Sequence, residues 1–329
     1  MADILHILNG DAPRPAMEQS SVPGTLSAWP DVLHDGPTPL ATGEEWIRAR
    51  CTHLGSLIDD DAEAMMARYR ASDAVLESWH ERDEVVFWLE HDLFDQLLLI
   101  RHLWWLTTNA ADRARHATRF SLVCGTDYIG MLKPEQFRPR FDARQPITAE
   151  QIRIGSAAWQ AYCSGEPTRL LPFAANSVHA NDAEQERQLP YLAAALRRLL
   201  EEFPAVSNGL ARSERQILEV LSDGPRTPEQ TFIAASRLED AIYMGDLSFW
   251  DLLKGLSDVP DPLVAVDVQD RPGRLPEGRL QITDAGRAVL DGRADRIGLN
   301  GISRWLGGTR LSADRVWRWT GSSLLPPAP

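Results

Sequence analysis

The chain has 329 residues, of which 43% are hydrophobic and 25% are charged, a composition typical of a globular protein that excludes a wholly disordered or fibrous one. Its 47 acidic residues outnumber its 34 basic residues, and the formal net charge of -13 excludes a bulk basic surface that would coat nucleic acid or an anionic membrane. The length predicts two domains.

The cysteines and the N-terminus predict a cytoplasmic protein. The cysteines are odd in number and far apart in the chain: Cys51, Cys124 and Cys163. No Cys-x-x-Cys pair occurs, so neither a zinc ribbon nor a disulfide framework is expected. The first residues lack the basic and apolar regions of a secretory signal. The most apolar stretch, 93–106, contains charged residues and is too short to span a bilayer, so no membrane partner is expected.

Four short apolar runs in the first half of the chain predict the strands of a mostly parallel, Rossmann-like sheet, because longer helical patterns separate them. The runs are 4–8, 25–29, 84–89 and 120–124. Helices are expected within 43–79 and 92–107. The predicted fold class is therefore α/β, with this α/β domain at 1–145.

A helical connector is predicted at 146–208, with helices at 148–162 and 190–203 and a surface loop at 165–182. The remaining residues, 209–329, show a different order of elements: helices at 213–221, from 227, and at 246–256, then strands at 263–268 and 279–283. Three helices followed by a two-stranded wing is the order of a winged helix. The sequence therefore predicts a winged-helix-like C-terminal domain, which continues into a tail rich in arginine and tryptophan.

All four predicted strands end in polar, acid-rich loops. Because ligands bind in the crevice at the carboxyl ends of parallel strands, these side chains are expected to converge there. They are Asn9, Asp11, Asp31, His34, Asp35, Glu90, His91, Asp92, Asp95 and Asp127. Crowded carboxylates raise one another's pKa unless a cation neutralises them. A divalent metal, a cationic substrate or a shared proton would each relieve the repulsion.

The densest polar segment is 88–96. On a helix His91 and Asp95 would lie at i,i+4 and face the same way, which makes them candidate metal ligands. Asp92 and Gln96 have the same spacing. Alternatively, Asp92 caps the helix N-terminus and His91 is a packed histidine.

The segment Asn9-Gly10-Asp11 has the form of a phosphate- or ribose-binding turn, and equally of a plain Asn-Gly turn. It is not a dinucleotide fingerprint, and neither a Gly-x-Ser-x-Gly elbow nor a P-loop occurs. Serine hydrolases and P-loop NTPases are thereby excluded. The candidate catalytic residues are His91, Asp92, Asp95 and His34. The candidate cofactor-binding residues are Asn9, Gly10, Asp11, Asp31 and Gln96.

Three N-terminal motifs carry a resemblance. They are His6-x-x-Asn9-Gly10-Asp11, Trp29-x-Asp31-Val-Leu-His34-x-Gly36-Pro37 and Trp88-x-Glu90-His91-Asp92-Leu-Phe-Asp95-Gln96. Together they resemble a bacterial family classed only as a domain of unknown function. The C-terminal part resembles the usual partner domain of that family, through Met244-Gly-Asp246, Thr283-x-Ala285-Gly286-Arg287 and Leu299-Asn-Gly-Ile302-x-Arg304-Trp-Leu-Gly-Gly308. The resemblance implies that the N-terminal motif residues form one site, and it implies no reaction.

These observations predict an enzyme that acts on a small polar or nucleotide-like ligand at the carboxyl edge of the sheet. A metal-dependent hydrolase or transferase is the candidate class, with a divalent metal as candidate cofactor held by His91 and Asp95. The alternatives are a ligand-sensing transcriptional regulator and a protein-interaction module that uses the winged-helix domain. DNA is not an expected partner, because the recognition helix would offer Asp246, Asp251 and one basic residue, Lys254. A homo-oligomer is a further candidate.

Overall fold

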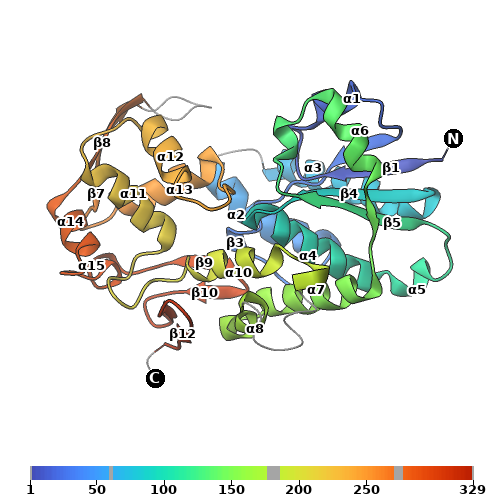
Figure 1. Cartoon of the computed structure of the whole chain (residues 1–329). Helices are drawn as coiled ribbons and strands as arrows, with labels where there is room; N and C mark the ends of the chain where they lie inside the picture. The colour runs from blue at the N-terminus through green and yellow to red at the C-terminus, as the bar shows by residue number, and fades with distance from the viewer. Residues whose placement is uncertain (1, 59–61, 176–185, 270–276, 328–329) are drawn as a thin grey trace. The chain divides into compact units, whose positions relative to one another are not determined.

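The computed structural model describes residues 2–58, 62–175, 186–269 and 277–327 (Figure 1). The chain divides into two units, Met1–Leu196 and Arg197–Pro329. The division lies within helix α10, Leu192–Leu200, which forms part of the connector predicted from the sequence.

The first unit is built on a five-stranded, mostly parallel sheet in the order β2-β1-β4-β5-β6. The strands are Thr25–Ala28 (β2), Ile4–Leu8 (β1), Glu84–Glu90 (β4), Arg119–Gly125 (β5) and Gln145–Pro146 (β6). The first four run parallel to their neighbours, and β6 pairs antiparallel with β5. The four strands predicted from apolar runs are thus confirmed, as is the mixed α/β class.

The central strands are buried along their whole length, because helices cover both faces of the sheet. Alternate residues of β1 and β4, among them Ile4 and Trp88, pack on one face against α1 and α6. On the opposite face, the ring of Phe87 lies 4.7 Å from that of His102 in α4. The strands therefore read as continuous apolar runs rather than as alternating patterns.

The remaining elements of the first unit surround this sheet. They are α1 (Arg14–Glu18), β3 (Gly36–Pro37), α2 (Gly43–Ile58), α3 (Ala62–Glu77), η1 (Ser78–Glu81), α4 (Leu93–Thr108), α5 (Ala110–Arg113), η2 (Ile129–Met131), α6 (Pro134–Asp142), α7 (Ala149–Tyr162), η3 (Pro167–Leu170) and α8 (Leu171–Ala174). The predicted loop at 165–182 thus contains two short helices, and its residues 176–182 lie outside the described part.

Helix α7 begins at the predicted capping box, in which the Thr148 side chain accepts a hydrogen bond from the Gln151 backbone N–H. It packs closely on α4, because Gly155 carries no side chain where a Cβ atom would come within 2.4 Å of Leu103. Helix α4 is consequently buried between α7 and the sheet, and all of its residues except Phe94 and the last two are buried.

The second unit has its own apolar core, formed by residues such as Ile217, Leu253 and Leu280. Its elements are α11 (Arg212–Ser222), α12 (Pro228–Ser236), α13 (Asp246–Ser257), β7 (Val264–Gln269), β8 (Glu277–Ile282), α14 (Asp284–Leu290), α15 (Arg296–Asn300), β9 (Arg304–Gly307), β10 (Thr309–Leu311), β11 (Arg318–Trp319) and β12 (Leu324–Leu325). Thr227 caps α12 as predicted, and β7 pairs antiparallel with β8. Most of the segment expected between these strands lies outside the described residues.

The arginine- and tryptophan-rich tail packs on its own unit. Trp317 is buried, and Arg318 forms an ion pair with Asp295 at 2.6 Å. Among the helices that the structure describes, none combines the length and the apolar character that crossing a bilayer requires.

Candidate functional site

The turn between β4 and α4 brings together three of the seven acidic residues singled out in the sequence. Asp92 has an extended backbone, and its carboxylate accepts a hydrogen bond from the Asp95 backbone N–H at 3.1 Å. It therefore caps α4, which begins at Leu93. His91 precedes the helix, so it does not share a helical face with Asp95 as the i,i+4 spacing predicts.

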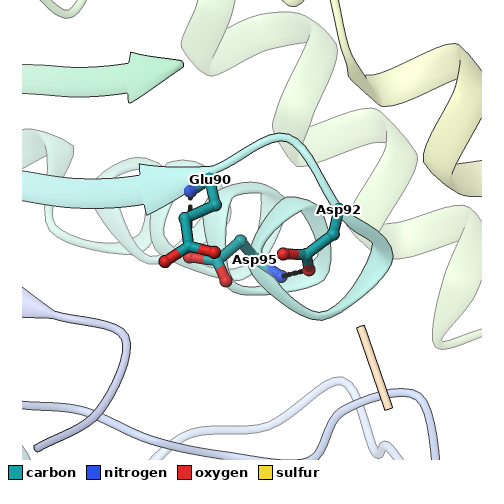
Figure 2. Close-up of side chains that lie close together, drawn as sticks. All are labelled: Glu90, Asp92 and Asp95. Atoms are coloured by element: carbon teal, nitrogen blue, oxygen red, sulfur yellow. Dashed lines mark hydrogen bonds between the residues drawn. The ribbon is translucent and has the colours of Figure 1, made fainter. Parts of the chain in front are cut away.

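Three carboxyl groups form a compact cluster at this turn, shown in Figure 2: Glu90, Asp92 and Asp95. Each offers an oxygen within 4.8 Å of the others. Their exposed fractions are 5%, 3% and 1%, so the cluster is shielded from bulk water. No lysine or arginine among the described residues forms an ion pair with any of them.

Neutral donors hold the cluster together. The Asn9 side-chain amide follows β1 and donates to Glu90 at 3.2 Å and to Asp95 at 3.0 Å. The backbone N–H of Ile129 donates to Glu90 Oε1 at 2.7 Å, and the backbone N–H of Glu90 donates to Asp95 Oδ1 at 3.0 Å. Because β1 and β4 are neighbours in the sheet, residues about 80 positions apart in sequence meet at this edge.

Burial and mutual repulsion raise the pKa values of these three carboxyl groups. Burial, followed by the charge of Asp92, raises the pKa of Glu90 to about 7. Burial also raises the pKa of Asp92. The pKa of Asp95 is raised well above its ordinary value, first by burial and then by the charges of Asp92 and Glu90. Without a cation the cluster therefore retains protons at pH values where surface carboxylates are fully ionised.

Gln96 supports the turn from within α4. Its side-chain amide donates to the Glu90 carbonyl oxygen at 2.6 Å and lies 3.6 Å from the Cys124 sulfur. Burial raises the pKa of Cys124 to about 12, so this thiol stays protonated and is not a nucleophile at neutral pH. The hydrogen bond from Gln96 thus holds the backbone of Glu90 at the end of β4.

His91 lies beside the cluster, in an aromatic setting. The centroid of its ring is 5.4 Å from that of Tyr128 and 6.0 Å from that of Tyr191. Its Nδ1 atom is inaccessible to solvent and has no hydrogen-bond partner among the described residues. The side chains that lie close enough together to hold a metal are those of Glu90, Asp92 and Asp95. The predicted ligand His91 is not among them.

The loop after β2 is held in place by a buried arginine. Arg50, from α2, forms an ion pair with Asp31 at 2.8 Å and donates to the carbonyl oxygens of Val32, Asp35 and Pro37. The carboxylate of Asp31 is thus used in holding the loop. His34, on the same loop, is 9% exposed, and its ring lies 6.2 Å from that of Phe94 at the start of α4.

The other predicted site residues lie outside the cluster. Asp11 is exposed and pairs with Arg14, while Asp127 is exposed and pairs with Arg140. A Cβ atom added at Gly10 would meet no atom within 4 Å, and the same holds for Gly125. The ends of β1 and β5 therefore border open space at the carboxyl edge.

No family model matches the chain, and a search of curated proteins finds no match. The functional inference consequently rests on the site itself.

Proposed function

We propose that the first unit is a metal-assisted enzyme domain that binds a small polar or nucleotide-like ligand at the carboxyl edge of its Rossmann-like sheet. The observation that carries this proposal is the buried cluster of Glu90, Asp92 and Asp95, which forms no ion pair with a lysine or arginine among the described residues. Three buried carboxyl groups favour a divalent cation, because carboxylate oxygens are preferred ligands of Mg²⁺, Mn²⁺ and Ca²⁺.

The position of the cluster in the sheet supports a ligand site. From β1 the chain passes to β2 on one side, and it later enters β4 on the other side of β1. This arrangement makes a switch point between β1 and β4, where the connections diverge and leave a crevice. Asn9 follows β1 and Glu90 ends β4, so the cluster stands at that switch point.

The expected chemistry is hydrolysis or group transfer. A divalent cation there would polarise an oxygen of the substrate or activate a water molecule. His91, whose Nδ1 has no protein partner in the described part of the chain, is the candidate general acid or base. Residues of the first and third sequence motifs, Asn9, Glu90 and Asp95, meet in this cluster, whereas Asp31 of the second motif pairs with Arg50.

The metal site is tested by thermal unfolding of EDTA-treated protein with Mg²⁺, Mn²⁺ or Ca²⁺. A cation present at about 1,000 times its Kd stabilises the native state by about 4 kcal/mol and raises the midpoint. Asp95→Asn keeps an acceptor for the Glu90 N–H but removes a charge, so we expect it to abolish the shift. Asp127→Asn makes the same change outside the cluster and should leave the shift intact. A midpoint that none of these metals moves would contradict the proposal.

A glycine substitution tests where the ligand lies. Gly10→Ala introduces a methyl group into open space, so we expect the stability of the protein to be unchanged. In the presence of Mn²⁺, the stabilisation produced by nucleoside mono-, di- or triphosphates should be lost, because the methyl group would fill space beside the end of β1 where the ligand is proposed to bind. Gly55→Ala in α2, where a Cβ atom also meets nothing within 4 Å, is the control. Equal nucleotide responses in both variants would place the ligand elsewhere.

A second candidate function is a ligand-sensing regulator or interaction module that uses the second unit as a winged helix. The observation that favours it is a set of exposed apolar side chains between α12 and the first turn of α13: Leu238, Ile242 and Leu247. Helix α13 itself carries acidic residues, and its basic Lys254 lies over the Trp250 ring. Protein contact is therefore favoured over DNA. Sedimentation of the full chain before and after Leu247→Ser tests self-association.

A further inference from the structure

A cavity of about 200 Å³ lies in the first unit between α3 and α4 and is not part of the carboxyl cluster. Its inner wall is formed by buried side chains: Trp29, Leu76, Arg101 and Trp105. Exposed residues of α3, including Ala74 and Glu77, lie at its rim. The cavity is thus open to solvent at one end and has a cationic side chain within.

Arg101 is a buried cation on which the charges of Asp73, Asp31 and Glu77 act without direct contact. It is 3% exposed, and among the described residues it forms no ion pair or hydrogen bond, while its Nε is both inaccessible and unpartnered. Its guanidinium lies over four indole rings, nearest to Trp46 at 4.8 Å and Trp104 at 4.9 Å. Indole faces attract a cation but leave its N–H donors without acceptors. Burial lowers the pKa of Arg101 to about 10, so it stays charged at neutral pH.

Two carboxylates face the same cavity. Asp73 accepts a hydrogen bond from the Trp29 indole N–H at 2.8 Å, and Glu77 accepts one from the Trp105 indole N–H at 2.9 Å. In each case one oxygen is engaged, and the other accepts no hydrogen bond from the described residues. The cavity therefore presents donors for an anion and acceptors for a cation.

We propose that this cavity binds a free amino acid, whose carboxylate pairs with Arg101 and whose ammonium group pairs with Asp73 and Glu77. A simple anion would be repelled by the two carboxylates, and a simple amine by the guanidinium. The volume is that of about seven water molecules at ~30 Å³ each, which suits a small molecule. The indole rings and Leu76 provide an apolar wall for its side chain. This site is independent of the proposed metal site.

The proposal is tested on the full chain by calorimetric titration with each of the common L-amino acids. We expect at least one to bind, and to quench or shift the fluorescence of the tryptophans that line the cavity. The amide of that amino acid lacks the carboxylate, and its N-acetyl derivative lacks the ammonium group. Both should bind at least about tenfold more weakly, since each loses a charged pair. No binding at millimolar concentration, or equal binding of either derivative, would overturn the proposal.

Variants at the rim locate the bound amino acid without disturbing Arg101. Ala74→Phe places a ring over the cavity and is expected to abolish binding. Ala71→Phe lies one helical turn away on the exposed surface of α3 and does not line the cavity, so it should bind normally. Glu77→Gln keeps an acceptor for the Trp105 indole N–H but loses the charge, and should weaken binding about tenfold. Undiminished binding by Ala74→Phe would show that the amino acid binds elsewhere and would overturn the assignment.

Discussion

Replacing Arg50 by methionine is expected to lower the free energy of unfolding by about 3–5 kcal/mol, because it leaves a buried charge without its partner. The ion pair between Arg50 and Asp31 is fully buried on both sides. The same guanidinium also donates to three carbonyl oxygens of the loop after β2. Denaturant unfolding of the full chain measures the loss.

A matched control separates the effect of breaking a buried ion pair from the effect of losing any arginine on the free energy of unfolding. Arg70 pairs with Glu44 at 2.7 Å, but their side chains are 44% and 58% exposed. Arg70→Met should therefore cost less than about 1 kcal/mol. Adding Asp31→Asn to Arg50→Met should recover part of the stability, because it removes the buried charge of Asp31 that Arg50→Met leaves without a partner. Equal losses for Arg50→Met and Arg70→Met would contradict this account of the loop.

In the metal-free protein, we expect stability to fall as the pH rises from about 5 to about 8. The pKa of Glu90 is raised by burial from 4.5 to about 7 in the folded state, so folding favours the protonated form. The stabilisation that protonated Glu90 provides is fully present below the pKa of this group in the unfolded chain. It is lost as the pH rises through the pKa of this group in the folded protein. A difference of this size corresponds to roughly 3 kcal/mol. Asp92 and Asp95, whose pKa values are also raised, act in the same direction.

Denaturant unfolding at several pH values checks this expectation. Glu90→Gln cannot ionise, so the variant should lose much of the decline that the wild type shows. Glu84 provides an internal contrast: burial alone would raise its pKa, but hydrogen bonds from Arg144 and Ser121 and nearby positive charges lower it to about 2. The stabilisation that ionised Glu84 provides is lost only as the pH falls below about 4.5, which is outside the range from about pH 5 to about pH 8 over which the decline is expected. The same decline in wild type and Glu90→Gln would refute the assignment.

Short sequence patterns, such as apolar runs and capping boxes, are sufficient to predict the main strands and several helix starts. Strand β1 was predicted with its observed bounds, because a run of buried apolar residues ends at an Asn-Gly turn. Thr148 and Thr227 marked helix starts through capping boxes, whose hydrogen bonds span three residues. Such features depend on neighbours in the chain, and sequence shows them directly.

The composition of the site depended on contacts that the sequence does not show. The sequence places Glu90 among the residues at the sheet edge, but its hydrogen bonds with Asn9 and Ile129 join residues far apart in the chain, which no local pattern shows. The i,i+4 spacing predicts a helical pairing of His91 with Asp95, which is wrong because Asp92 caps the helix and His91 precedes it. The sequence also predicts ligand binding by Asp31, but the packing of α2 gives this carboxylate an ion pair with Arg50, a residue 19 positions away.

Arg101 illustrates the same limit. In the sequence it interrupts an apolar stretch and argues against a membrane span. The structure buries it among tryptophans from four separate segments of the first unit. Among the described residues it forms no direct ion pair, which is a property of the packed interior that no spacing along the chain indicates.

The most direct test of the central claim is calorimetric titration of the EDTA-treated protein with Mn²⁺ near pH 6.5, in two buffers with different heats of ionisation. We predict that one ion binds and that protons are released, because the cation displaces protons held by the cluster of Glu90, Asp92 and Asp95. Asp95→Asn should abolish the binding and Asp127→Asn should preserve it. Absence of binding at millimolar Mn²⁺, or binding that Asp95→Asn leaves unchanged, would contradict a metal site at the switch point of the sheet.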